Sequence, residues 1–374
     1  MRRIINIHRA ATLVAFALAL AGAFPERASA QGESAVPFLL IAPNSRASGI
    51  GEAGTGTVDD ASAIFWNPGE LAFLDGQEIS VTHANWLPQF NLPDLFYDNL
   101  NYRIRVDGIG GTLSASVTYL SLGEFQVTNS SGPQVVDKFK SYEYAVTAGY
   151  STKAFDDLGI GVNLRFIHSA LSPIGTETEV GNGIASTVSV DLAMMWRPTE
   201  LDVPLIGDIG RRFSLGMNLS NLGPKVTYVD AAQADPLPTN IRLGFGYKIL
   251  DDEFNNMTAS LDFSRLLVTR HPDGTSDPFY KALFSAWGTD GGGLQKVVVS
   301  GGMEYWYGAP RLLALRIGYF YENPNTGNRK FLTFGAGIRY DIFGFDFSYI
   351  SAADGHPLSD TIRFSLLIGW GGKP

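Results

Sequence analysis

Side chains in the C-terminal part of the chain alternate between apolar residues and polar or small ones. In residues 361–370 every even-numbered position is apolar, from Ile362 to Trp370, whereas the odd-numbered positions include Thr361, Arg363 and Ser365. A repeat of two residues is the periodicity of a β-strand, whose side chains point to opposite faces in turn. Because a strand of roughly 9–11 residues can cross a bilayer at a tilt, the pattern predicts a spanning strand with one apolar face.

The same alternation recurs after residue 76 and predicts fourteen strands. One face of each strand is apolar, and the other mixes Gly, Ser, Thr and charged residues. An even number of strands is typical of an antiparallel up-and-down bacterial barrel, and lipid tolerates strands only in a closed barrel. The fold class is therefore an all-β membrane protein, with predicted strands at 77–87, 97–107, 111–128, 139–154, 159–172, 184–198, 211–229, 238–250, 255–270, 294–308, 311–322, 331–342, 343–352 and 361–370.

A soluble β-sandwich is the alternative explanation for this alternation, but its strands are commonly only about 5–6 residues long. Aromatic residues near the predicted strand ends favour the barrel, because they are typical of an interfacial girdle. These residues are Tyr119, Trp196, Tyr247, Tyr321, Tyr340 and Trp370.

The predicted connections alternate in length. The longer ones are 88–96, 129–138, 173–183, 230–237, 271–293, 323–330 and 353–360, and those between them are mostly short, with 198–210 as an exception. Outer-membrane barrels have short periplasmic turns and longer external loops. We therefore expect both termini of the mature chain in the periplasm of a Gram-negative bacterium.

The first thirty residues are predicted to be a signal peptide. Arg2 and Arg3 precede an apolar run at 10–24, and Ala28-Ser-Ala30 supplies a cleavage site. A membrane anchor is the alternative, but the run is shorter than the ~20 residues that a spanning helix needs. Without the leader, which carries four Arg and one Glu, the net charge changes from −9 to −12, which disfavours nucleic acid as a partner. The chain has no Cys and so no disulfides.

Residues 37–76 do not alternate, and residues 31–76 are predicted to form a hatch inside the barrel, whose strands occupy 77–370. Gly49, Gly51 and Gly54 match G-x-G-x-x-G, but no strand precedes them as a nucleotide-binding loop requires. Residues 60–66 favour a helix with Asp59 or Asp60 as its N-cap, which Pro68 should end. Side chains alone cannot fill the interior of so wide a barrel, and glycines permit close packing against its wall.

Residues 45–54 and 59–72 resemble the N-terminal signature of the PorV/PorQ-type outer-membrane proteins, which are related to the FadL-type transporters of hydrophobic compounds. The family pattern has an Asp-Asp-Ala-Ser-Ala core and a Trp-Asn-Pro-Ala-Gly-Leu ending; here Gly69-Glu70-Leu71 follows Pro68. The segments 277–287, 318–324, 343–349 and 357–367 are similar to the PorV members. The hatch-motif residues that carry the resemblance are Asp59, Asp60, Ser62, Trp66, Asn67 and Pro68.

The resemblance implies an outer-membrane component of the type IX secretion system. Its partners would be the translocon barrel, a sortase-like attachment complex and cargo proteins with a C-terminal signal domain, besides outer-membrane lipid. No cofactor is implied. A FadL-type carrier of hydrophobic small molecules is the alternative, and a structural barrel without transport is a third possibility.

Charged side chains on the predicted inward faces could line a polar conduit, or could pair with one another to fix the hatch. A plugged barrel needs its interior charges paired, which favours the second interpretation. These residues are Arg165, Asp191, Arg242, Asp262, Glu304, Arg316, Arg339, Asp346 and Arg363.

Chemistry of other kinds is weakly represented, so an enzyme is not expected. His83, His168, His271 and His356 have no metal-ligand spacing, and no G-x-S-x-G motif occurs. Apolar residues of the loops 88–96 and 271–293 are candidates for partner docking or for dipping into the membrane. They are Phe90, Leu95, Phe96, Tyr97, Phe279 and Tyr280.

Overall fold

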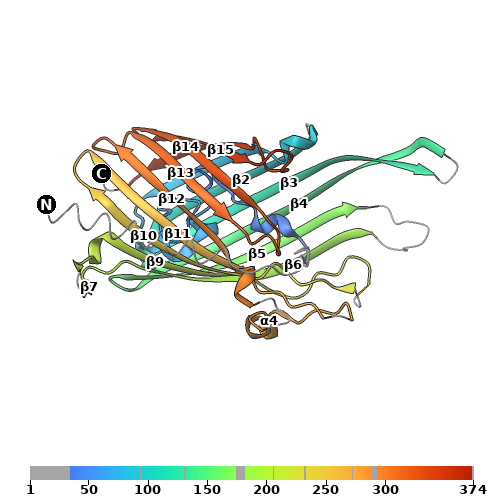
Figure 1. Cartoon of the computed structure of the whole chain (residues 1–374), viewed down its shortest axis with the longest axis horizontal. Coiled ribbons are helices and arrows are strands. Elements are labelled where there is room, and N and C mark those ends of the chain that lie inside the picture. Colours follow the sequence, from blue (N-terminus) through green and yellow to red (C-terminus); the bar gives the residue numbers. More distant parts are fainter. Residues whose placement is uncertain are drawn as a thin grey trace.

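The computed structural model describes residues 34–372 except 93, 130–131, 174–181, 205, 231–232, 272 and 289–292, so the predicted signal peptide lies outside the described residues. Fourteen antiparallel strands close into one barrel, which confirms the predicted fold class (Figure 1). The barrel strands are β1 (Gln77–Asn85), β2 (Leu95–Val106), β3 (Gly111–Asn129), β4 (Gly132–Phe155), β5 (Leu158–Ser172), β6 (Gly183–Trp196), β9 (Phe213–Leu222), β10 (Asn240–Asp251), β11 (Asn255–Leu266), β12 (Val298–Tyr307), β13 (Leu313–Tyr321), β14 (Lys330–Tyr340), β15 (Phe343–Ala352) and β16 (Ile362–Trp370).

Each strand pairs with its neighbours in sequence, and β1 closes the barrel against β16. The closing register runs from Gln77 opposite Trp370 to Ala84 opposite Arg363. In β16 the outward Leu366 is 59% exposed whereas the inward Arg363 is 1% exposed. The predicted alternation is thus the alternation between a lipid-facing and a lumen-facing surface.

The connections lie at two distinct ends of the barrel, which we call the turn end and the loop end. The turn end carries short links such as residues 156–157 and 341–342. Its one long link holds a small two-stranded sheet of β7 (Asp202–Val203) and β8 (Gly207–Asp208), which accounts for the length of 198–210. The loop end carries the longer connections, one of which contains helix α4 (Phe279–Ser285).

Several strand ends differ from the prediction at the loop end. β3 and β4 extend into the connection expected at 129–138, and their hairpin projects beyond the other strands (Figure 1). Phe125 and Phe139 stack across it, with ring centroids 5.6 Å apart. β9 ends at Leu222 rather than near 229, because Val226 and Leu237 of the following segment are buried in the barrel interior.

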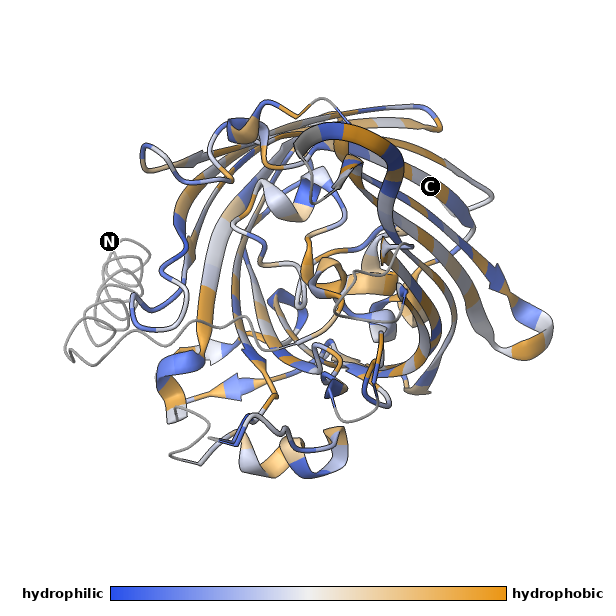
Figure 2. Ribbon diagram, turned by 90° about the vertical axis from the view of Figure 1, so that its right-hand side faces the viewer, coloured by the Kyte–Doolittle hydropathy of each residue, from blue (hydrophilic) through white to orange (hydrophobic). Residues whose placement is uncertain are grey.

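Residues 34–76, which we call the lumen segment, lie inside the barrel. The segment contains the short helices η1 (Pro37–Leu40), α2 (Ser45–Ser48), α3 (Ala63–Trp66) and η2 (Pro68–Phe73). Viewed from the loop end, these turns occupy the space within the ring of strands (Figure 2). None of the described helices is long and apolar enough to cross a membrane.

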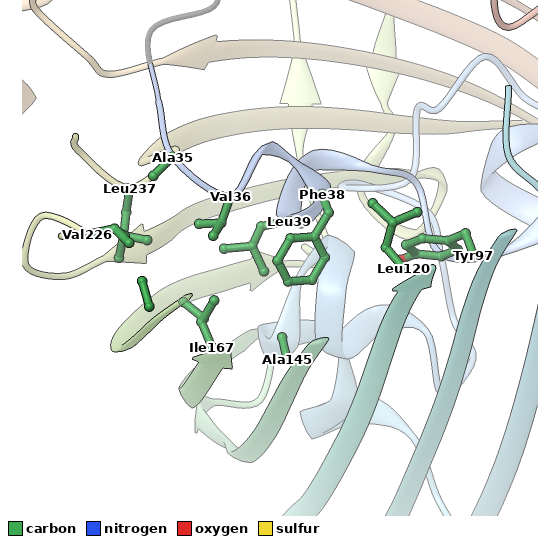
Figure 3. Packing of buried hydrophobic residues seen from close by; sticks show 11 residues of the cluster. Ala35, Val36, Phe38, Leu39, Tyr97, Leu120, Ala145, Ile167, Val226 and Leu237 are labelled. Atoms are coloured by element: carbon green, nitrogen blue, oxygen red, sulfur yellow. The ribbon is translucent and has the colours of Figure 1, made fainter. Parts of the chain in front are cut away.

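The lumen segment runs from the loop end to the turn end. At the loop end the Ala35 N–H donates to the Pro236 carbonyl over 2.9 Å, and Phe38 packs beside Tyr97 and Leu120 (Figure 3). At the turn end the Gly76 carbonyl accepts from the Arg105 N–H over 2.9 Å. The described chain therefore begins near the loop end, where its apolar side chains are buried, and the periplasmic location of the termini stays a prediction.

The helix expected at 60–66 is shorter than predicted. It begins after Ser62, and the carboxylate of Asp60 accepts the Ser62 N–H over 2.9 Å instead of capping a helix that starts at Asp60. The helix ends at Trp66, as Asn67-Pro68 predicts.

Candidate functional site

Arg46 is the centre of the contacts that hold the lumen segment to the barrel wall. Its side chain is 7% exposed and forms two hydrogen bonds to Glu304 of β12, at 2.8 Å from Nε and 2.7 Å from Nη2. Arg46 also donates to Asp59 and, over 3.3 Å, to Asp60. The Nε of Arg316 in β13 approaches the same Glu304 carboxylate at 2.7 Å. A planar guanidinium suits such paired contacts with a carboxylate.

The ion network continues around the wall from Arg316. Arg316 donates to Asp346 of β15 over 2.8 Å, and Arg339 of β14 donates to the other Asp346 oxygen over 2.7 Å. The ring of Trp306 lies 5.3 Å from the Arg316 guanidinium carbon and 5.1 Å from that of Arg339. Alternating charges thus connect the lumen segment to four consecutive strands.

A second cluster lies on the opposite side of the lumen, on β5 and β6. Arg165 donates to Asp191 over 2.6 Å and 3.1 Å. Asn163 reaches both the Asp191 carboxylate at 3.1 Å and the Ile64 carbonyl of the lumen segment at 2.8 Å. The Arg165–Asp191 ion pair is therefore connected to the lumen segment through the side-chain amide of Asn163 and not through a charged residue.

Three of the predicted lumen charges have other surroundings. Arg242 stacks on the lumen segment, 4.7 Å from the Phe65 ring centroid. Asp262 accepts the Thr55 N–H over 2.8 Å. Arg363 lies 4.0 Å from Glu52 and is 1% exposed.

The motif residues Trp66 and Asn67 fasten the lumen segment to itself and to the wall. Trp66 Nε1 donates to Asn44 Oδ1 over 2.9 Å. The Asn67 amide nitrogen donates to the carbonyls of Thr55 and Met194, both at 3.0 Å, while its oxygen accepts the Gly69 N–H. Asn67 alone therefore links two parts of the segment and strand β6.

Glycine lets the segment approach the wall at backbone distance. A Cβ on Gly318 of β13 would lie 2.0 Å from the Gly51 nitrogen, and one on Gly216 of β9 would lie 2.0 Å from the Thr55 carbonyl oxygen. Gly51 itself has a φ of +75°, a conformation that L side chains rarely adopt.

Arg46, Glu52 and Glu70 take part in these contacts although the alternation does not point to them. Glu70 is 1% exposed and lies 2.6 Å from Arg197 at the turn end. The available signal is chemical: a charged side chain in a Gly/Ala-rich segment destined for a closed lumen needs a partner there.

A cavity of about 830 Å³ lies between the lumen segment and the loop end. Its lining includes the apolar side chains of Phe38, Trp86 and Phe320 and the charged side chains of Glu52 and Glu322. Glu322 is held by Arg329 at 2.7 Å. The space could hold an amphipathic guest.

The candidate docking residues fall into two groups. Leu95 and Tyr97 belong to β2, point inward and are 6% and 1% exposed, so the expectation that they are loop residues available for docking is wrong. Phe96 faces outward beside Tyr119, with ring centroids 6.0 Å apart. The exposed candidates, at 54% and 64%, are Phe90 and Tyr280, and Phe279 contacts the Tyr280 ring at 5.7 Å.

A metal centre is not visible in the part of the chain that the structure describes. No group of three or more His, Asp or Glu side chains there is arranged to hold a metal ion. His83 pairs with Asp98 at 2.6 Å on the outer surface, and His271 contacts Asp277 at 3.0 Å in the loop that carries α4.

Comparison with known proteins identifies a family and a fold. The model of the family described as type IX secretion system protein PorV matches residues 26–273, which is more than half of the chain. No curated protein matches the sequence.

The fold is similar to that of several solved barrels. The Pseudomonas putida toluene transporter TodX is 13% identical with a TM-score of 0.51, and the match covers 87% of this chain and 96% of that one. A TodX mutant described as a monoaromatic hydrocarbon channel is 12% identical with a TM-score of 0.51, over 87% and 97% of the two chains. The Ralstonia pickettii toluene transporter TbuX is 11% identical with a TM-score of 0.45, over 88% and 100%.

Proposed function

This chain belongs to the family of type IX secretion system protein PorV, and we propose that it receives secreted cargo at the translocon of that system and helps to deliver it for attachment to the cell surface. The protein is an outer-membrane β-barrel. Its partners in this role are the translocon barrel, a sortase-like attachment complex and cargo with a C-terminal signal domain. The family match is the observation that carries the proposal.

The occupied lumen supports a role as a delivery factor rather than as the conduit itself. Residues 31–76 act in this proposal as a hatch, held by the ion network from Arg46 to Arg339 and by backbone contacts at Gly51 and Gly318. A polypeptide could pass only after these buried ion pairs had separated, which is costly because each charge would lose its partner. Cargo therefore meets the outside of this barrel.

The loop end is the surface that fits cargo and partners. In the proposed orientation the short turns lie in the periplasm and the longer loops lie outside the cell. Phe90, between β1 and β2, is 54% exposed there. Leu92 of the same loop is 53% exposed, and a patch of exposed apolar side chains on a loop is typical of a contact site.

Deletion of the chain from its host tests the proposal. Cargo should accumulate in the periplasm with its C-terminal signal domain intact, because in this proposal the translocon cannot release cargo until this protein receives it. Re-expression of the intact chain should restore surface delivery. Normal surface delivery in the deletion strain would overturn the proposed function.

A matched pair of variants tests the loop end. Phe90→Ser should reduce the translocon and attachment proteins that co-purify in mild detergent. Ile206→Ser is the control, because Ile206 is 63% exposed but belongs to the turn end. Equal recovery of partners with both variants would contradict docking at the loop end.

The cavity near Phe38 favours a second candidate function, the carriage of hydrophobic small molecules. Its apolar lining residues and its volume of about 830 Å³ are suitable for a small guest. This function predicts that a hydrophobic fluorescent probe binds the purified chain and that Phe320→Asp abolishes binding. Secretion that persists in a Phe320→Asp strain would separate the two functions.

A further inference from the structure

Four neighbouring strands of the barrel carry an outward row of aromatic side chains near the loop end. Phe96, Tyr119, Tyr142, Tyr144 and His168, on β2 to β5, contact one another in turn. The ring centroids lie 6.0 Å apart between Phe96 and Tyr119, 6.0 Å apart between Tyr119 and Tyr142, and 5.1 Å apart between Tyr144 and His168. Such rings sit where the hydrocarbon of a bilayer meets the polar surface. The row therefore marks the level of that boundary.

The strands on another side of the barrel lack this row. At the level of the row, β6 carries Ser186 opposite His168, and the outward side chains near the loop ends of β9, β10 and β12 are Leu219, Ile241 and Val299. On β11, Phe263 lies opposite Val299, which is one aromatic side chain rather than a row. Aliphatic side chains suit the hydrocarbon but do not provide the amphipathic ring that an interface favours.

Helix α4 lies outside the wall beside these strands, below the barrel in Figure 1 and outside the ring of strands in Figure 2. It covers Arg265, an outward residue near the loop end of β11 that is 2% exposed. Arg265 donates to the carbonyls of Ala286 and Gly293, and its guanidinium lies 4.7 Å from the Trp287 ring centroid. A guanidinium on the lipid face of a barrel is destabilising, so this cover places α4 against the membrane side of the wall.

The two faces of α4 differ in burial. Ala282 and Ala286 point to the barrel and are 1% and 0% exposed. Tyr280 and Phe284 of α4 and Trp287 of the turn after it follow the three- and four-residue spacing of one helical face and are 64%, 79% and 43% exposed. An exposed aromatic face of this kind is costly in water.

The start of α4 is held in a fixed orientation. The Asp277 carboxylate accepts from Lys281 at 2.7 Å, from Ser285 at 2.7 Å and from His271 at 3.0 Å. These hydrogen bonds fix the orientation of α4, so that its aromatic face points away from the barrel.

We propose that α4 and the turn after it form an interfacial segment. Its Tyr280, Phe284 and Trp287 side chains insert into the lipid leaflet at the loop end and complete the aromatic girdle. The occupant is lipid because the patch continues an apolar band that already faces lipid. Leu243, Leu261 and Ile317 form that band on β10, β11 and β13 and are 36%, 40% and 48% exposed. The inference requires only that the barrel spans a membrane and does not depend on its role in secretion.

The absence of Cys allows a direct test with single spin labels on the full mature chain. Phe284→Cys is labelled in phosphatidylcholine–phosphatidylglycerol liposomes, and its accessibility to oxygen and to a water-soluble nickel chelate is measured. Leu261→Cys is the lipid-facing control, and Asp354→Cys, on the exposed loop after β15, is the water-facing control. Retained heat-modifiable migration shows that each labelled barrel is folded.

The proposal predicts that Phe284→Cys favours oxygen over the nickel chelate, as Leu261→Cys does. A ratio equal to that of Asp354→Cys would overturn it and would leave the aromatic face as a surface for a protein partner. As a second readout, bromine-substituted lipid should quench the intact chain more than Trp287→Phe. Equal quenching of the two chains would also contradict the insertion of Trp287 into lipid.

Discussion

Replacement of Arg46 by Met tests whether the buried ion network holds the lumen segment in place. The change leaves a side chain of similar length but removes the charge that contacts Glu304, Asp59 and Asp60. Loss of one partner from a buried ion pair costs about 3–5 kcal/mol. Glu304 retains its ion pair with Arg316, and Asp59 retains its ion pair with Arg311 at 3.3 Å. We therefore expect the seated position of the lumen segment to lose about 3 kcal/mol of stability, at the lower end of this range.

The expected loss of stability can be measured as the rate at which a Cys in the lumen segment is labelled. Ala47 is 0% exposed inside α2, so a Cys at this position reacts with a maleimide only when the segment opens. If opening is in equilibrium and becomes about 3 kcal/mol easier, labelling accelerates by roughly a hundredfold, since each 1.4 kcal/mol is about tenfold. The barrel strands should stay folded, as heat-modifiable migration would show.

The control for Arg46→Met is Lys138→Met, which breaks the exposed pair between Lys138 and Glu124 at 2.7 Å. Such a pair contributes about 0–1 kcal/mol, so labelling of the Ala47→Cys reporter should stay close to its original rate. If Arg46→Met labels no faster than Lys138→Met, the ion network does not hold the segment. The glycine contacts and the carbonyl bonds would then account for its position.

Two further changes test the backbone contacts and the loop of α4. Gly318→Ala should lower the yield of folded barrel and cost about 1–3 kcal/mol in urea unfolding, because its Cβ would meet the Gly51 nitrogen at 2.0 Å, whereas Gly108→Ala meets nothing within 4 Å and should be neutral. Burial opposes ionisation of Asp277, but hydrogen bonds from Lys281 and two other donors outweigh it and hold its pKa well below the usual range. A lowered folded-state pKa stabilises the loop above the unfolded value of about 3.9 and loses that effect as the pH falls below it. Protease resistance of this loop should therefore fall at acidic pH and lose its pH dependence in Asp277→Asn; an unchanged profile would contradict the assignment.

The strands could be predicted because lipid on one side and the lumen on the other impose a strict repeat of two. The prediction is weakest where a strand leaves that environment. β9 ends early because residues beyond Leu222 turn into the lumen, where the apolar Val226 is as well buried as it would be in lipid. The β3–β4 hairpin continues beyond the prediction because the ladder does not stop at the stacked Phe125 and Phe139, and Val127 pairs with Asp137 and Thr128 with Val135 beyond them.

The inward charges could be predicted one by one, but their partners could not. Glu304 and Arg316 face the lumen by alternation, yet the residue that completes their network, Arg46, belongs to a segment with no periodic pattern. The position of Arg46 depends on how residues 34–76 fold inside the closed barrel, and the sequence pattern does not show this. The same limit explains Tyr97, whose aromatic ring fits a surface loop or a lumen wall equally well by residue type.

The ladder between β1 and β16 has a consequence for the order of assembly. It joins the two ends of the barrel sequence, and the lumen segment that precedes β1 is already enclosed when this ladder is complete. Within β16, Ser365 accepts the Ser45 N–H over 3.0 Å, so the last strand contacts the enclosed chain directly. Closure around a seated segment makes that contact as the final pairing forms, whereas later entry would have to thread some forty residues past backbone-tight glycine contacts. We therefore expect the segment to be seated before β1 and β16 pair, because a barrel that closes empty can be filled only by threading the segment through it.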